Sequence, residues 1–310
     1  RDDGRCSMRM KRAGWMACAA AALAMCVLGC ARRKKRWRPS KPWKVYQVKV
    51  LEGFDTPESV CIDPTTGIGY VSNVVCPKGA TEKVNAKDGK GFISRLTPGG
   101  RIDKLRWVDS TEAAPLHAVK GLCILDGVLY GADIDRVVRY EVKTGRPLAP
   151  IRISGAKLLN DMATDGRDVY VSDTGGGQIY RIRGDRAEVF QELERANGLA
   201  FHRGRMFALS VGLHEMYELD PAGKTPPQPF GLARHFKGID GIAVLADGSF
   251  LVTDVWGSKF FWVGADRRTV HLLGPLASPA DLAIDRRRGL ALVPLFWEGK
   301  VVVYGLDRPR

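Results

Sequence analysis

The sequence has few of the side chains that soft-metal, haem or disulfide chemistry requires. It contains five histidines in 310 residues, and of its seven cysteines only Cys61, Cys76 and Cys123 lie beyond residue 30. These three are an odd number with no CxxC spacing, which excludes a zinc, haem or dithiol motif and gives no indication of a disulfide framework. A phosphate-binding loop, a nucleotide fingerprint and a Ser/His/Asp motif are also missing.

Long helical periodicity is missing as well, so helical bundles and alternating α/β folds are excluded. The chain instead shows short β-rich runs joined by glycine turns. The clearest example is residues 159–182, where a run opening at Asn160 turns at Asp165–Gly166 and a second run ends on Asp173. Strands joined by such turns are typical of an antiparallel meander.

This unit recurs six times. The openers lie 37–43 residues apart, except for the first pair, which lie 62 apart because of a polar insertion over residues 76–91. The six openers are PESVCID (57–63), VKGLCI (119–124), LNDMAT (159–164), ANGLAF (196–201), IDGIAV (239–244) and PADLAI (279–284). A period of about 40 residues with several short strands predicts an all-β fold, a six-bladed β-propeller of four-stranded antiparallel blades over residues 45–310. We expect the first blade to run from Tyr46 to about Leu96, with a strand near Tyr46–Val50 as an alternative closure of the last blade.

The openers align in two columns. Three residues after the opening position stands a column of small residues, which we expect to let the inner strands converge: Cys61, Cys123, Ala163, Ala200, Ala243 and Ala283. The opening column starts each inner strand and therefore surrounds the mouth of the central channel. It contains Glu58, Lys120, Asn160, Asn197, Asp240 and Ala280.

The opening column contains an oxygen-only set of Glu58, Asn160, Asn197 and Asp240, which suits a hard divalent cation such as Ca²⁺. The second strands run back to the same mouth, so Asp133, Asp173 and Asp254 at their ends predict a second tier that could contact substrate. The alternative is that these dipeptides are turns or caps. Each blade already has its own hairpin glycine further on, which favours the metal.

These residues resemble those of the SMP-30/gluconolactonase/paraoxonase-type propellers, in the contexts PES (Glu58), LND (Asn160), NGLAF (Asn197) and DGIAV (Asp240). The resemblance covers residues 45–310. It implies a divalent metal, usually calcium, bound by Glu58, Asn197 and Asp240, with Asn160 contacting metal or substrate. It also implies a lactone or ester substrate whose carbonyl the metal polarises, and Asp240 as the general base.

Two positions depart from that family pattern. Lys120 stands within the ring, with His117 just before it, so both are added to Asp240 as candidate catalytic residues. Lys120 would bind an anionic substrate, or would instead pair with Glu58 and Asp240 as a structural cluster. Leu158 stands where some gluconolactonases carry a substrate-binding arginine, so sugar-lactone specificity is not implied. We expect Trp256 and residues 296–297 mainly to pack between blades; the alternative is that they wall the mouth.

The first 44 residues have a different character from the repeats. Met10-Lys11-Arg12, an uncharged run over residues 13–29 and Cys30 predict a signal peptide with a bacterial lipobox, in which Cys30 is lipidated. Residues 31–44 carry eight basic and no acidic residues and predict a tether at the membrane surface, or a plain solvated linker. We therefore expect a periplasm-facing lipoprotein of the bacterial cell envelope. The alternative is an uncleaved anchor with a cytoplasmic propeller, because basic residues after the apolar run resist export.

The remaining charge argues against nucleic acid as a partner. The net charge of the chain is +14, yet residues 45–310 contribute only +3, with 35 basic and 32 acidic residues. The basic character therefore belongs to the tether and not to the propeller. The favoured function is a metal-dependent hydrolase of lactones or related esters. The alternative is a non-catalytic propeller that binds a small anionic ligand or a protein at the same mouth.

Overall fold

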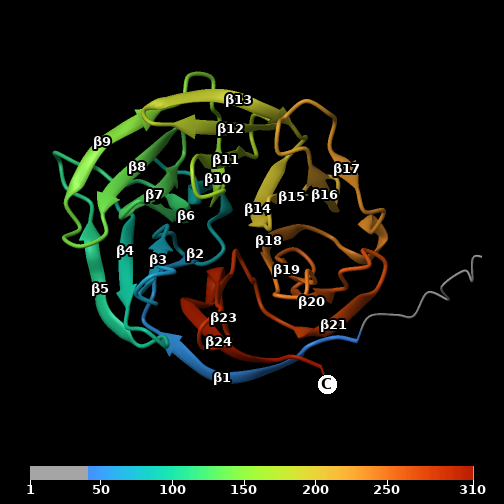
Figure 1. The fold of residues 1–310 in the computed structure, drawn as a ribbon. Coiled ribbons are helices and arrows are strands. Elements are labelled where there is room, and N and C mark those ends of the chain that lie inside the picture. The colour runs from blue at the N-terminus through green and yellow to red at the C-terminus, as the bar shows by residue number, and fades with distance from the viewer. Residues whose placement is uncertain (1–40, 310) are drawn as a thin grey trace, which may run out of the picture. The chain divides into compact units, whose positions relative to one another are not determined.

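The computed structural model describes residues 41–309, in which six four-stranded antiparallel sheets are arranged radially around a central channel (Figure 1). The predicted fold class and blade number are confirmed. The predicted signal peptide, the lipidation of Cys30 and most of the tether lie outside the described residues. Within residues 41–309, no helix is both long and apolar enough to cross a membrane.

The blades follow one another along the chain, each beginning at the channel and ending at the outer edge. The strands of blades 1 to 3 are β2 (Pro57–Ile62), β3 (Gly69–Asn73), β4 (Phe92–Leu96), β5 (Ile102–Asp109), β6 (Val119–Leu125), β7 (Val128–Asp133), β8 (Arg136–Glu141), β9 (Pro147–Arg152), β10 (Leu159–Thr164), β11 (Val169–Asp173), β12 (Gln178–Arg183) and β13 (Arg186–Glu192). Those of blades 4 and 5 are β14 (Ala196–His202), β15 (Arg205–Ser210), β16 (Glu215–Leu219), β17 (Gln228–Pro229), β18 (Ile239–Val244), β19 (Phe250–Asp254), β20 (Lys259–Val263) and β21 (Val270–Pro275).

Blade 6 is assembled from both ends of the propeller. Its inner strands are β22 (Ala283–Asp285), β23 (Leu290–Leu295) and β24 (Lys300–Asp307), and its outer strand is β1 (Lys44–Glu52). β1 pairs antiparallel with β24 from Lys44 opposite Asp307 to Glu52 opposite Lys300. The alternative closure is therefore right, and the first blade runs from Pro57 to Asp109 rather than from Tyr46 to Leu96. β1 thus supplies the fourth strand that blade 6 would otherwise lack and covers the edge of β24.

The hydrophobic core lies between the blades. Each pair of neighbouring sheets encloses an apolar cluster, such as Tyr70 and Ile93 of blade 1 against Leu122 and Val138 of blade 2. Blades 4 and 5 share a cluster that contains Phe207 and Phe250, whose rings meet edge to face with centroids 5.0 Å apart. This packing explains why the strands read as near-continuous apolar runs, since both faces of each blade are covered.

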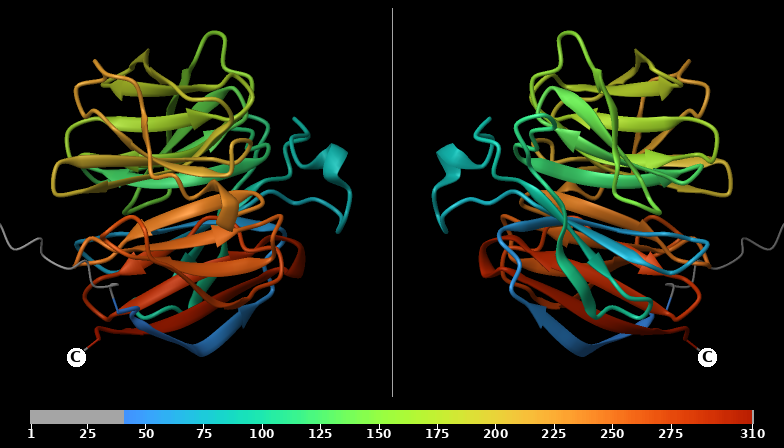
Figure 2. Two further views of the ribbon diagram at one scale, coloured as in Figure 1. Left: turned by 90° about the vertical axis from the view of Figure 1, so that its right-hand side faces the viewer. Right: turned by 90° about the vertical axis from the view of Figure 1, so that its left-hand side faces the viewer.

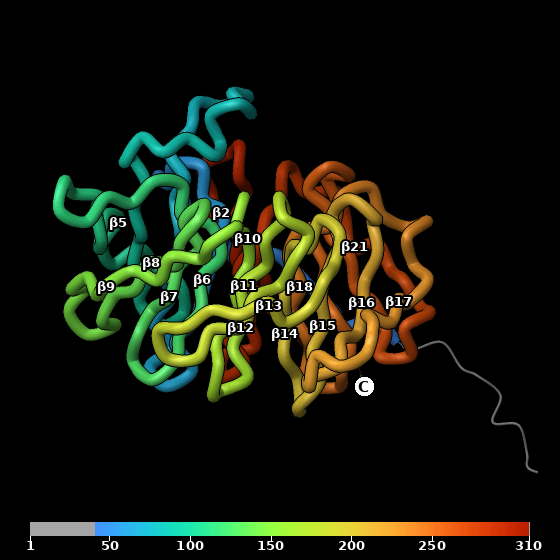
Figure 3. Tube along the Cα trace, turned by 90° about the horizontal axis from the view of Figure 1, so that it is seen from above, coloured from blue at the N-terminus to red at the C-terminus, as the bar shows by residue number. Residues whose placement is uncertain are grey.

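The insertion between β3 and β4 projects from one face of the propeller (Figures 2 and 3). The insertion contains one 3₁₀ turn, η1 (Thr81–Lys83). Two other 3₁₀ turns lie on the same face: η2 (Ala233–His235) before β18, and η3 (Phe296–Glu298) after β23. β2 runs away from the mouth at Glu58, and the antiparallel β3 runs back to it. The insertion follows β3, so the face from which it projects is the mouth face.

Candidate functional site

The ring at the mouth is built by β-bulges. In blades 1 to 5 the inner strand has one residue more than its partner strand at the opening-column position. In blade 3, for example, Leu159 pairs with Asp173 but Met162 pairs with Val171. A bulge bends the strand and re-aims the side chain. The same device therefore turns five side chains toward the mouth: Glu58, Lys120, Asn160, Asn197 and Asp240.

Glycines next to the ring hold neighbouring blades in backbone contact. A Cβ on Gly121 would lie 2.5 Å from the Asn160 carbonyl oxygen, and one on Gly198 would lie 2.4 Å from that of Asp240. The closest approach of the inner strands is thus one residue after the opening column. The column of small residues three positions after the openers contributes instead to the packing between blades, where Cys123 and Ala163 join apolar clusters.

The ring side chains form one electrostatic cluster. Glu58, Lys120, Asn197 and Asp240 are all buried, and Asn160 is half-buried. Burial raises the pKa of Glu58 well above its usual range; the Lys120 charge opposes this rise, and the carboxylates of Asp240 and Asp281 add to it. Burial also raises the pKa of Asp240 to about 6, against the hydrogen bond from Asn197 Nδ2 to its Oδ1 (2.6 Å) and the charge of Lys120.

Two further carboxyl groups, Asp161 and Asp281, lie just inside the ring and were not predicted. Ser59 Oγ donates to Asp281 Oδ2 (2.6 Å), and the backbone N–H of Leu199 donates to Asp161 Oδ2 (2.6 Å). Burial raises the pKa of Asp281 to about 7, and burial together with the Asp281 charge raises the pKa of Asp161. Each follows an opening-column residue directly, so strand alternation would place its side chain on the opposite face. The irregular backbone that brings it to the channel leaves no recognisable pattern in the sequence.

The ring residues fit a hard cation. Glu58 Oε2 is a buried acceptor with no hydrogen-bond partner, and Glu58, Asp240, Asp161 and Asp281 together outnumber the single ammonium of Lys120. No group of three or more His, Cys, Asp or Glu side chains in residues 41–309 is placed to bind a metal. The set at the mouth instead consists of two carboxylates and two amides, which is within the range that calcium accepts.

The predicted second tier is brought to the mouth but has its oxygens engaged. Asp173 accepts the N–H groups of Lys157, Leu158 and Gly176 at 2.8–2.9 Å. Asp254 does the same for Lys237, Gly238 and Gly257. These bonds anchor each inter-blade loop to the second strand, and a contact of this tier with substrate remains a prediction.

Asp133 is engaged in the same way. It accepts the N–H of Ala118 at 2.9 Å and pairs with Arg136 at 2.8 Å. All three second-tier carboxylates are fully buried, so a network of backbone and guanidinium donors holds each of them in place.

The insertion covers the ring on the side of blades 6, 1 and 2. Lys78 pairs with Glu298 of blade 6 (2.9 Å), and Lys87 pairs with Asp135 of blade 2 (2.6 Å). Beneath it lies an apolar cluster that brings residues of the insertion against the channel: Val74, Cys76, Ala118, Ile134, Ala280 and Phe296. The Phe296 ring lies 6.0 Å from Lys120 Nζ. The insertion therefore encloses Lys120 within the mouth.

The candidate base His117 is bound to the insertion, because its Nδ1 accepts the N–H of Gly89 (3.1 Å). His235 lies in η2, and burial lowers its pKa. Trp256 is 56% exposed and contacts His214 on the uncovered side of the mouth face. Trp256 is therefore not buried between blades, because its indole lies over Gly238 at the surface, and a role in walling the mouth stays a prediction.

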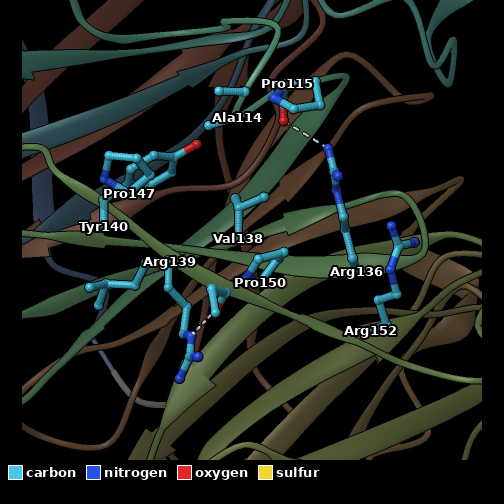
Figure 4. Close-up of a pocket in the computed structure, with 12 residues that line it drawn as sticks. Ala114, Pro115, Arg136, Val138, Arg139, Tyr140, Pro147, Pro150 and Arg152 are labelled. Atoms are coloured by element: carbon cyan, nitrogen blue, oxygen red, sulfur yellow. Dashed lines mark hydrogen bonds between the residues drawn. The ribbon is translucent and has the colours of Figure 1, made fainter.

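A separate hollow lies away from the ring, at the outer part of blade 2 (Figure 4). It has a volume of ≈ 480 Å³ and is lined by Tyr140 and by residues 147–150 of β9. Of its arginines, Arg136 donates to the Pro115 carbonyl and pairs with Asp133, while Arg139 donates to the Ala149 carbonyl and pairs with Asp185. The third, Arg152, also lines the hollow. Among the described residues, no Asp, Glu, His, Cys or Ser side chain lines it to act as a base or nucleophile, so this hollow is not the candidate active site.

The described chain is thus a six-bladed β-propeller with a buried, charged ring at one mouth of its channel. No family model and no curated protein matches the sequence. Solved structures do match over 86% of the chain. They include a putative gluconolactonase (TM-score 0.60, 15% identity, 94% of that chain covered) and luciferin-regenerating enzyme (0.59, 15%, 96%). A catalytically inactive variant of virginiamycin B lyase from Staphylococcus aureus, with quinupristin, also matches (0.58, 11%, 100%).

At these identities the matches show a shared fold and carry no residue roles. The resemblance to SMP-30/gluconolactonase-type propellers is confirmed at the level of the fold.

Proposed function

We propose that the chain is a metal-assisted hydrolase of lactones or related esters, acting at the mouth of the propeller. The observation that carries the proposal is the buried ring, in which Glu58 Oε2 has no partner and the carboxyl groups outnumber the one ammonium. Such a ring favours an added positive charge. Matches to a putative gluconolactonase and to virginiamycin B lyase support a hydrolase or lyase reaction.

Glu58, Asn160, Asn197 and Asp240 would hold the cation, with calcium as the first candidate. When bound, such an ion supplies Lewis-acid polarisation of a carbonyl oxygen. The protein contributes a dry, fixed surrounding, since the bulges and the glycine contacts set the position of every ring side chain. This pre-organisation is what electrostatic stabilisation of an oxyanion requires.

Asp240 would act as the general base. Its pKa is raised to about 6 by burial, so it is mostly ionised at neutral pH yet basic enough to take a proton from an attacking water. The hydrogen bond from Asn197 Nδ2 fixes one carboxylate oxygen and leaves the other free for that proton. His117 serves less well as a base, because the insertion occupies its Nδ1.

Lys120 would bind the anionic part of the substrate or the developing negative charge. Its ammonium lies in the same cluster as Glu58 and Asp240, since it lowers the pKa of both. The substrate would enter from the side of blades 3 to 5, because the insertion covers the opposite side. That side presents Trp256 and Leu213, which are exposed and suit an apolar group on the ester.

The second candidate function is ligand or protein binding without catalysis. The observation in its favour is the burial of Glu58 and Lys120, because a buried cluster of opposite charges can stabilise the fold as well as serve a substrate. A binding protein would tolerate Asp240→Asn with its ligand affinity intact, whereas a hydrolase would lose its turnover.

The test is metal content together with hydrolysis of a panel of lactones and aryl esters. We expect about one calcium per chain, and a loss of at least 100-fold in kcat for Asp240→Asn. Glu112→Gln, an exposed residue of the loop before β6, is the matched control and should leave both unchanged. Absence of metal, together with no turnover of any substrate by the unaltered chain, would remove the hydrolase and leave the binding protein.

A further inference from the structure

A second cavity lies at the opposite end of the channel from the ring. It has a volume of ≈ 400 Å³ and is formed where the inner strands of blades 1, 2, 3 and 6 end. We call it the basal pocket. Its wall is largely apolar or weakly polar: Cys61, Ile62, Pro64, Gly67, Cys123, Ile124, Thr164 and Ile284. Its size is that of a pocket for a small organic molecule.

Four charged residues also line the basal pocket, and its two carboxylates are committed to their own turns. Asp63 accepts the N–H of Thr65 (2.8 Å) and the hydroxyl of Thr66 (2.7 Å). Asp285 accepts the N–H groups of the two residues after Arg286 and pairs with the Arg288 guanidinium (3.0 Å). Within residues 41–309, neither carboxylate forms an ion pair with Arg286 or Arg287.

Those other charges are the guanidinium groups of Arg286 and Arg287. Arg286 Nη2 donates to the Val244 carbonyl (2.7 Å), and Arg287 Nη1 donates to the Thr65 carbonyl (2.7 Å). Within residues 41–309 neither forms an ion pair, and desolvation lowers the pKa of Arg286. Each guanidinium has five N–H groups, so most remain available, and their planar arrangement matches a carboxylate or phosphate.

The inner end of the pocket determines how an anion could lie in it. The pocket continues into a smaller cavity of ≈ 180 Å³, with which it shares Cys61, Ile62 and Ile284. That cavity reaches the carboxyl groups of Asp161 and Asp281. A negative group is therefore disfavoured at the inner end and favoured at the rim beside the arginines, while an apolar chain suits the wall between them.

We propose that the basal pocket binds a small amphipathic organic anion, with its carboxylate or phosphate between Arg286 and Arg287 and its apolar chain against Ile62, Ile124 and Ile284. This site is separate from the ring and does not depend on the function proposed there. Two charge-assisted contacts on one anionic group provide the specificity, and the apolar wall adds affinity.

Calorimetric titration of the full chain with octanoate, octyl phosphate and octan-1-ol tests the proposal. We expect saturable binding of at least one anion and at least tenfold weaker binding of the uncharged alcohol. The double variant Arg286→Gln/Arg287→Gln should weaken anion binding at least tenfold. Arg203→Gln is the matched control, because Arg203 donates to the Ala246 carbonyl in a neighbouring hairpin and does not line the pocket.

Three results would overturn the proposal. The first is no saturable binding of either anion to the unaltered chain. The second is equal affinity in the unaltered chain and the double variant. The third is equal weakening by Arg203→Gln, which would indicate a general effect of surface charge. All three substituted arginines are exposed, so circular dichroism and melting should show that the variants keep the fold of the unaltered chain.

Discussion

Lys120 is the residue on which the two candidate functions differ most. It is buried within a ring of oxygen ligands, where its charge lowers the pKa of both Glu58 and Asp240. A divalent cation at the ring would carry the same sign of charge as Lys120 and would have to coexist with it. The ammonium therefore reduces the affinity of the ring for metal while it supplies an anchor for an anion.

Replacing Lys120 by methionine should separate these effects. We expect calcium to bind roughly tenfold more tightly to Lys120→Met, because a like charge is removed. Without calcium the variant should melt at a lower temperature than the unaltered chain, because its buried carboxyl groups lose their compensating charge. Calorimetry and melting with and without calcium measure both. An unchanged calcium affinity would show that Lys120 does not act on the metal site.

Asp281 gives a pH dependence whose sign follows from its environment. Its pKa in the folded protein is about 7, above the usual value, so the folded state binds a proton more tightly than the unfolded state. Stability should therefore fall as the pH rises from about 4 to about 7, by an amount on the order of a few kcal/mol.

The variant Asp281→Asn should lose less stability over this pH range than the unaltered chain, because the amide oxygen can still accept the Ser59 hydroxyl and carries no charge. The loss that remains comes from Glu58, Asp161 and Asp240, whose pKa values are also raised. Urea denaturation at pH 5 and pH 8, in the presence of a chelator, makes the comparison. If both proteins lose equal stability between these pH values, Asp281 is not the group responsible.

At the scale of the strand, the β-bulges override the alternation of side chains between the two faces of a strand. They place consecutive residues such as Asn160 and Asp161 both toward the channel, and they leave extra N–H groups that side chains satisfy. Ser172 Oγ accepts the N–H of Asp161 at 2.9 Å, and Thr253 Oγ1 accepts that of Gly241 at 2.8 Å. The glycines beside the ring are therefore part of the site.

Gly198→Ala tests that role, since a Cβ there would lie 2.4 Å from the Asp240 carbonyl oxygen. We expect a loss of about 2–4 kcal/mol in stability and a weakened ligand or metal affinity, because Asp240 must move. Gly204→Ala is the control, because its Cβ meets nothing within 4 Å and only its φ of +73° opposes the change. It should cost about 1 kcal/mol and leave affinity unchanged. Equal losses of affinity would argue against the backbone contact.

At the scale of the whole molecule, the ring depends on β1. This strand is the outer strand of blade 6, and Trp43 beside it donates from Nε1 to Asp247 of blade 5 (2.8 Å). Removal of residues 1–40 should leave a folded propeller, whereas removal of residues 1–52 should expose the edge of β24 and cause aggregation. Size-exclusion chromatography and melting distinguish the two truncations. A soluble, cooperatively melting 53–310 fragment would contradict this dependence.

Much of this architecture can be predicted from the repeats, because each opener marks one inner strand and the hairpin glycines mark the turns. The blade number, the insertion and the composition of the ring follow from that spacing. Asp161, Asp281 and the basal pocket could not be predicted, because they depend on bulges and on where strands from different blades end. The cover over Lys120 depends on pairs far apart in the sequence, such as Lys78 with Glu298.

The pairing of β1 with β24 also sets an order of events during synthesis. β1 leaves the ribosome before every other strand of the propeller, and its partner at Lys300–Asp307 leaves after all the others. The nascent chain must therefore carry an unpaired, β-forming segment through the synthesis of five complete blades. Any product that terminates before about residue 300 would have no partner for that segment, so completion of the propeller depends on the synthesis of β24.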